Sequence, residues 1–285
     1  MKKRLTLAIV AVCFVLGAAA DTVPRRVISL IPATTEMMFA MGAGDRLVAV
    51  GSYDKFPPEA ARLPKVGALL DPDTERILSM RPDLVIVYGT QTELKKSLER
   101  ASIPYYLYEH RAMPDIMATV RALGARIGFK AQADTLASNM ERGLAGVRAA
   151  VAGRGRPRTL LVFERDAASL QNIYASGGYG FLADLLDVAG GENVFGDVKK
   201  QAVQASTEMI LARRPEVIIE LRYGDGATNV DPARDLKAWS PLGSIPAVKA
   251  KRIHILVGDH YVVPGPRIVT AAREMGRVLH PEARW

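Results

Sequence analysis

The chain has 285 residues, of which 49% are hydrophobic and 24% are charged. This length allows one large domain or two of ordinary size, and the composition is typical of a globular protein with a sizeable core. It excludes a disordered chain, a collagen-like fibre and a polytopic membrane protein. The formal net charge is +8, but basic residues are scattered among acidic ones without the dense stripe that nucleic acids favour. We therefore expect no nucleic-acid partner.

The first twenty residues have the three parts of a secretory signal peptide. A basic head, Met1–Arg4, precedes the apolar run Leu5–Leu16, and small residues lead to Ala20. The run is shorter than the roughly 20 residues that a membrane-spanning helix needs. We expect cleavage after Ala20. The only cysteine, Cys13, lies in this segment, so the exported chain is expected to have no disulfide, zinc–thiolate site or cysteine nucleophile.

Short apolar runs alternate with segments of helical spacing along the rest of the chain. The runs expected to form strands are residues 27–31, 47–50, 84–87, 105–108, 160–163, 217–221 and 253–257. This alternation predicts an α/β fold with parallel-type sheets covered on both faces. Residues from about 115 to 151 have the spacing of one long helix or two, and further helices are expected at 181–189 and 267–279.

These elements predict two α/β lobes joined by a helix. We expect a signal peptide at residues 1–20, an N-terminal lobe at 21–115, a bridging helix at 116–152 and a C-terminal lobe at 153–285. One unit occurs in both lobes, because residues 73–86 align with residues 206–219. Each copy begins with an N-cap residue, has glutamate in its first turn and ends in Arg-Pro before an apolar strand. Two similar lobes leave a cleft, where small ligands commonly bind.

Five motifs in this order resemble the periplasmic substrate-binding proteins of ABC importers for vitamin B12, haem and ferric siderophores. They are RVISLIPATTE (26–36), VGSYDKFPPEA (50–60), the duplicated unit, GGENVF (190–195) and PGPRI (264–268). The resemblance implies the helical-backbone, class III fold of these proteins, a periplasmic location and a monomer. It implies binding without catalysis, so no catalytic residue, metal or cofactor is expected. The implied protein partners are an ABC permease of the inner membrane and its ATPase.

The resemblance is strongest to members that bind vitamin B12, which implies cobalamin or a related corrinoid as the ligand. Tyr53 matches a ring-stacking tyrosine of those members, and Tyr174 matches an aromatic residue of the other lobe. Asp259 matches a polar contact, beside His260 and Tyr261.

Three positions depart from those members. Leu69, which we include in the expected ligand site, and Ala202 stand where they have tryptophans. Val263 stands where they have an arginine. These departures affect the ligand assignment more than the fold.

In the same family, one glutamate on each lobe engages arginines of the permease. The matching residues are Glu75 and Glu208, which stand at the same place in the two copies of the duplicated unit. A first-turn glutamate also complements its own helix dipole. The repetition favours docking.

Haem and ferric siderophores remain alternative ligands. Many haem carriers have a ligating tyrosine where this chain has Ala68, so iron would need His260 or one of Tyr88, Tyr179 and Tyr261. A siderophore would favour basic residues such as Arg165 and Arg222 near strand ends.

A secreted α/β enzyme is the remote alternative. The sequence has no nucleophile elbow, no phosphate-binding glycine loop and no paired histidines typical of a zinc enzyme.

Overall fold

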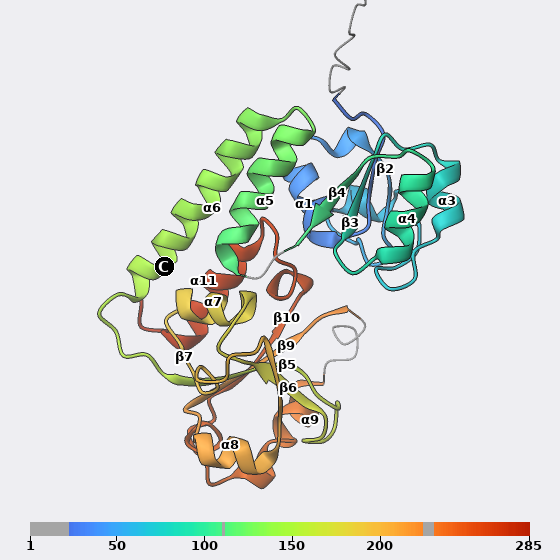
Figure 1. The fold of residues 1–285 in the computed structure, drawn as a ribbon. Coiled ribbons are helices and arrows are strands. Elements are labelled where there is room, and N and C mark those ends of the chain that lie inside the picture. Colours follow the sequence, from blue (N-terminus) through green and yellow to red (C-terminus); the bar gives the residue numbers. More distant parts are fainter. Residues whose placement is uncertain (1–22, 110–111, 225–230) are drawn as a thin grey trace, which may run out of the picture.

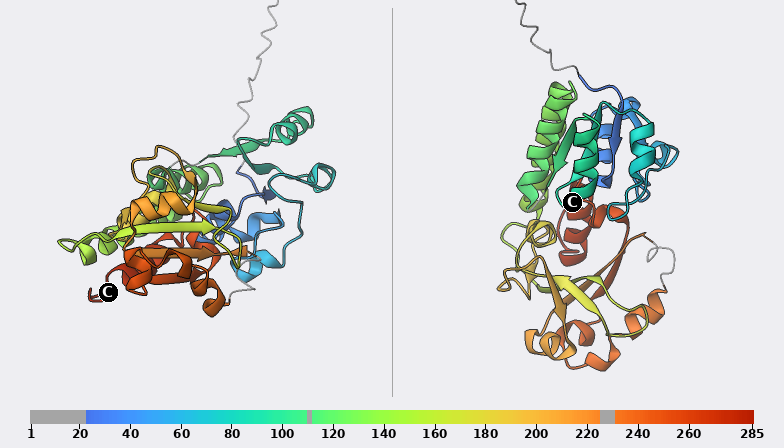
Figure 2. Two further views of the ribbon diagram at one scale, coloured as in Figure 1. Left: turned by 90° about the horizontal axis from the view of Figure 1, so that it is seen from below. Right: turned by 45° about the vertical axis from the view of Figure 1, so that its right-hand side comes forward.

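The computed structural model describes residues 23–109, 112–224 and 231–285. It has the two-lobed α/β architecture that the sequence predicts, with the N-terminal lobe above and the C-terminal lobe below in Figure 1 and in the right-hand view of Figure 2. The expected signal peptide lies outside the described residues. Across the described ranges, no helix is both long and apolar enough to cross a lipid bilayer.

The N-terminal lobe is built on a four-stranded parallel sheet in the order β2-β1-β3-β4. Its strands are β1 (Val27–Ser29), β2 (Leu47–Val50), β3 (Leu84–Tyr88) and β4 (Tyr105–Tyr108). Its helices are α1 (Pro32–Ala40), α2 (Pro58–Ala61), α3 (Thr74–Ser79) and α4 (Thr92–Arg100), with a 3-10 turn η1 (Gly44–Arg46). The first four residues of β3 are all buried, as expected for a parallel strand covered on both faces.

The C-terminal lobe contains a six-stranded mixed sheet in the order β10-β9-β5-β6-β8, with β7 beside β5. Its strands are β5 (Arg158–Glu164), β6 (Ile173–Ser176), β7 (Glu192–Asn193), β8 (Ala202–Ala205), β9 (Val217–Arg222) and β10 (Ile253–Val257). The helical elements are α7 (Phe181–Val188), α8 (Thr207–Arg213), α9 (Pro232–Lys237), η3 (Ser240–Leu242), α10 (Pro246–Lys249), η4 (Asp259–Tyr261) and α11 (Ile268–Leu279). The sequence pattern missed β6 and β8, which are antiparallel, because they are short and contain small or polar residues.

Two antiparallel helices occupy the stretch where the sequence allowed one helix or two. They are α5 (Met113–Arg126) and α6 (Lys130–Val151), and they lie side by side in Figure 1. A Cβ at Gly124 would lie 2.1 Å from the Ala133 Cβ, so glycine permits this close approach. Gly128 has a φ of +77°, which suits the turn between the helices. The 22-residue α6 then leads from one lobe to the other.

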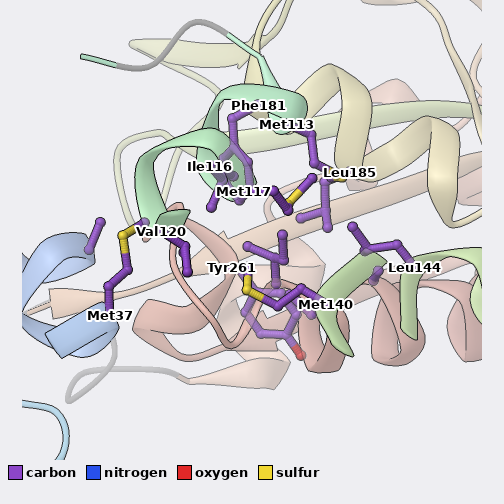
Figure 3. Close-up of a cluster of buried hydrophobic side chains, with 14 of the residues drawn as sticks. Met37, Met113, Ile116, Met117, Val120, Met140, Leu144, Phe181, Leu185 and Tyr261 are labelled. Atoms are coloured by element: carbon purple, nitrogen blue, oxygen red, sulfur yellow. The ribbon is translucent and has the colours of Figure 1, made fainter. Parts of the chain in front are cut away.

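One apolar cluster contains side chains from both lobes. It includes Met37 of α1, Ile116 of α5, Met140 of α6 and Leu185 of α7, as Figure 3 shows, together with buried residues of both sheets. Burial of such side chains stabilises the fold by about 1.5–3 kcal/mol each. The lobes are therefore fused through a common core.

The duplicated unit has the same local geometry in both lobes. The Asp73 carboxylate accepts a hydrogen bond from Arg76 N at 3.0 Å, and the Ser206 hydroxyl accepts one from Met209 N at 3.2 Å. Each copy then reaches its strand through an arginine with positive φ, 47° at Arg81 and 49° at Arg214.

Replacing Leu185 by Ala should lower the free energy of unfolding by about 2–5 kcal/mol, because it leaves a cavity in the common core. Leu211→Ala is the matched control: Leu185 is fully buried in α7, whereas Leu211 is 39% exposed in α8, and its loss should cost under about 1 kcal/mol. Urea unfolding followed by circular dichroism and by tryptophan fluorescence should give coincident transitions. Separate transitions for the two lobes would contradict a common core.

Candidate functional site

A cavity of about 320 Å³ lies between the lobes. The N-terminal lobe and the C-terminal lobe both contribute to its walls, which consist of Pro32, Glu36, Tyr53, Lys55, Phe56, Tyr223, Gly224, Asp259, Val262, Val263 and Arg267. Most of these residues follow the carboxyl ends of parallel strands β1, β2, β9 and β10. This is where ligands bind in open α/β sheets.

The loop after β2 presents an exposed aromatic side chain to this cavity. Gly51 N donates to Ser29 O at 2.9 Å, and Ser52 N donates to Gly67 O at 2.8 Å, so the start of the loop is fixed to neighbouring backbone. Tyr53 follows with 68% of its surface exposed. Such a ring can stack on a flat ligand.

An ion pair joins the lobes at the cavity wall. Arg267, just before α11, donates from Nε to Glu36 Oε2 at 2.8 Å and from an Nη atom to Glu36 Oε1 at 2.5 Å. Its guanidinium also lies 4.0 Å from the centre of the Phe56 ring. Burial raises the pKa of Glu36, and the hydrogen bond and charge of Arg267 oppose that rise. Bidentate pairing of this kind fixes the relative orientation of the guanidinium and the carboxylate as well as the distance between them.

The wall from the C-terminal lobe is held by a hydrogen bond between a side chain and the backbone. The Asp259 carboxylate accepts a hydrogen bond from Gly224 N at 2.8 Å, which ties the end of β9 to η4. Tyr223 lies at this end, half-buried, and its burial raises the pKa of its phenol. The cavity therefore has aromatic side chains on both lobes.

Comparison with known proteins identifies the family. Residues 27–259 match the sequence pattern of the family described as periplasmic binding protein. The chain belongs to the periplasmic binding protein family. Both the family and the fold are those of substrate-binding proteins.

The relatives of this periplasmic binding protein include proteins named for two different ligands, vitamin B12 and haem. A vitamin B12-binding protein of Pectobacterium carotovorum is 29% identical over 262 residues, covering 91% of this chain and 90% of its own. The vitamin B12-binding protein of Vibrio cholerae superposes with a TM-score of 0.76 at 24% identity, covering 91% of this chain and 98% of its own. A periplasmic haem-binding protein of Roseiflexus, in its apo form, gives 0.77 at 25% identity, covering 91% and 99%.

The structure brings three of the expected ligand residues of this binding protein together. Tyr53 and Asp259 line the interlobe cavity. Leu69 lines a smaller cavity of about 160 Å³ that shares Pro32 and Tyr53 with the larger one. Leu69 O accepts a hydrogen bond from Gln91 Nε2 at 2.9 Å, which fixes the loop on which it lies.

The other three expected residues are absent from the walls of the larger cavity. His260 Nε2 lies 2.9 Å from Glu274 Oε2, and the Tyr261 hydroxyl donates to the same oxygen at 2.5 Å. Both side chains thus face α11, behind Asp259. Tyr174 packs in the C-terminal sheet, with its ring centre 6.4 Å from that of Phe163.

The two arginines considered for a siderophore lie in a buried ion network. Arg165 Nε donates to Glu220 Oε1 at 2.7 Å, and Arg222 donates to Glu220 Oε2 at 2.8 Å. Asp235 and the indole of Trp239 complete the network. Since buried charges are held by their partners, these cations serve the C-terminal lobe and do not line the cavity.

The two expected docking glutamates are exposed, each in the first turn of a short helix. Glu75 lies in α3 of one lobe and Glu208 in α8 of the other. The Ser206 hydroxyl, which lies beside Glu208, lowers the pKa of that carboxyl. Both positions therefore offer a carboxylate to a partner surface.

Sequence reasoning gave no role to several residues that the structure places in the cavity. The clearest are Glu36, Phe56, Tyr223 and Arg267. Glu36 and Arg267 lie in motifs that carried the family resemblance, and their opposite charges were the available signal. Tyr223 lies outside those motifs. No three histidine, cysteine or carboxylate side chains in the described part of the chain gather as metal ligands.

Proposed function

We propose that this periplasmic binding protein captures cobalamin or a related corrinoid between its lobes and delivers it to an ABC permease with its ATPase. The observation that carries the proposal is the set of aromatic side chains from both lobes in one cavity: Tyr53 and Phe56 on one side, and Tyr223 on the other. A corrinoid is a flat macrocycle with an amide fringe, so it favours aromatic faces with a few polar groups. The vitamin B12-binding relatives support this choice.

The polar groups of the cavity suit the amide fringe. Lys55 can donate hydrogen bonds and Asp259 can accept them, while Val262 and Val263 add apolar contact. A corrinoid is larger than this cavity and would extend over the smaller one, where Leu69 provides apolar contact. The reaction is binding and release, with no covalent step.

Haem is the second candidate, because phenol groups line the cavity and haem-binding proteins share the fold. Tyr53 and Tyr223 line the cavity and could ligate iron, whereas Tyr88 and Tyr179 do not line it. His260 and Tyr261 are engaged by Glu274. A ligating tyrosine is a phenolate, and burial of Tyr223 disfavours that form. Tyr53 remains the available iron ligand.

The geometry of Glu75 and Glu208 supports a docking role. Each side chain projects from the first turn of a short helix. The N-cap residue of that helix fixes the direction of the turn. Exposed charges at an interface mainly determine partner recognition and the association rate. We propose that they contact basic residues of the permease.

Replacing Tyr53 by Ala should weaken cobalamin binding about tenfold, because a stacking face is lost. Tyr179→Ala is the matched control, since Tyr179 is also exposed but does not line the cavity. Titration of the purified protein with cyanocobalamin, and in parallel with haemin, measures both affinities. Haemin binding with a shifted absorption band, lost in Tyr53→Phe, together with no cobalamin binding, would favour haem and overturn the corrinoid proposal.

The double variant Glu75→Ala, Glu208→Ala should abolish cobalamin uptake by cells while leaving the affinity of the purified protein unchanged. Glu93→Ala is the control, because Glu93 is an exposed glutamate in the first turn of another helix, α4. Uptake of labelled cobalamin by cells carrying each variant provides the measurement. Normal uptake by the double variant, or loss of its ligand affinity, would contradict the docking role.

A further inference from the structure

A buried carboxyl group beside the ligand cavity has no hydrogen-bond partner. Asp54 directly follows Tyr53 and is only 1% exposed, yet both of its carboxyl oxygens are unpartnered. The hydroxyl oxygen of Thr35 is also buried without a partner. Burying a polar group without a hydrogen bond is costly, and such a group needs an explanation.

Two of the donors near Asp54 are engaged elsewhere. Gly51 N donates to Ser29 O at 2.9 Å, and Lys65 Nζ donates to the backbone oxygens of Asp54 and Ala60 at 2.7 and 3.1 Å. The Thr35 hydroxyl lies beside the carboxyl and favours its ionised form, but the two groups do not meet in hydrogen-bond geometry. The Gly51 N–H also favours the ionised carboxyl without reaching hydrogen-bond geometry, so Asp54 keeps acceptor capacity.

Asp54 forms part of the wall of the smaller cavity, with Tyr53 and Leu69. Its position depends on Gly51 in the same wall, because a Cβ at Gly51 would lie only 2.8 Å from Asp54 Oδ2. The remaining wall residues are largely apolar: Leu30, Ile31, Pro32, Ser52 and Ala68. An acceptor in apolar surroundings favours a small donor group held in one place.

Building on the proposed function, we infer that the smaller cavity is a subsite for a primary carboxamide arm of the ligand, with Asp54 accepting its N–H hydrogen bonds. A corrinoid carries such amides around its ring. Haem carries carboxylates instead, and a carboxylate arm would place a like charge against Asp54. Asp54 thus selects an amide-fringed macrocycle over one with acidic arms.

The subsite gives binding a pH dependence. Burial raises the pKa of Asp54 to about 7; the Thr35 hydroxyl and Lys65 oppose this rise, and Glu36 adds to it. The ionised carboxylate only accepts hydrogen bonds, whereas the protonated group also carries a donor. An amide donor therefore favours the ionised form, so binding releases a proton and affinity rises with pH. With that pKa, the gain between pH 6 and pH 8 is about tenfold.

Calorimetric titration with cyanocobalamin at pH 6 and pH 8, in two buffers of different ionisation enthalpy, tests this inference. The wild type should release a proton near neutral pH and gain affinity by about tenfold. Asp54→Asn should bind roughly tenfold more weakly at pH 8, because a charge-assisted hydrogen bond is replaced by a neutral one, and should show no proton release or pH dependence. Asp71→Asn, at an exposed carboxylate of a neighbouring loop, should behave as the wild type.

A corrinoid with one peripheral amide hydrolysed to a carboxylate provides a second test. Among such derivatives, the one altered at the subsite should bind the wild type more weakly and Asp54→Asn nearly as well as cobalamin. Cobalamin binding that is equal in wild type and Asp54→Asn, without proton release, would overturn this inference and leave the proposed function standing. Failure of the wild type to bind cobalamin would overturn both. If Asp54→Asn does not fold, absence of wild-type proton release is itself sufficient to overturn the inference.

Discussion

The apolar core shared by the two lobes determines the form of the binding site. Side chains of α1, α5, α6, α7 and α11 pack into one cluster that also contains buried residues of both sheets. Separating the lobes would expose part of this cluster, at about 25 cal/mol for each Å² of apolar surface. The carboxyl ends of the two sets of parallel strands are consequently held facing one cavity. We infer that the cleft is largely preformed.

Charged side chains at the cavity and in the C-terminal lobe form ion pairs. The Glu36–Arg267 pair orients its two side chains more than it adds to net stability. Desolvation offsets much of the attraction in a buried ion pair. It connects α1 to the start of α11 across the cavity wall and supports Phe56. In the C-terminal lobe, Arg165 and Arg222 are neutralised by Glu220 and its neighbours. The charges of Glu36 and Arg267 are thus paired with each other, and aromatic side chains from both lobes line the same cavity. Such a cavity agrees with the proposed corrinoid ligand.

Local sequence signals predicted most of the fold. The run at β3 is continuously apolar, and the buried part of β9 is interrupted only by Glu220, because both strands are buried on both faces. The caps Asp73 and Ser206 mark the duplicated unit. The antiparallel strands β6 and β8 escaped prediction because their few residues lack a strong apolar pattern.

The site was predicted less completely, because its contacts join distant parts of the chain. Glu36 and Arg267 are 231 residues apart in sequence, and nothing local indicates that they pair. His260 and Tyr261 adjoin Asp259, but the turn η4 directs them to Glu274 and away from the cavity walls. Asp54 resembles any polar loop residue until its burial is known.

The distance between the lobes, measured without and with cobalamin, tests the preformed cleft most directly. Spin labels can be attached to cysteines introduced at Lys96 in α4 and Lys249 in α10, since the one native cysteine lies in the expected signal peptide. Pulsed electron spin resonance should give nearly the same distance distribution in both states. A large shift on binding would show a wide hinge motion and contradict the account.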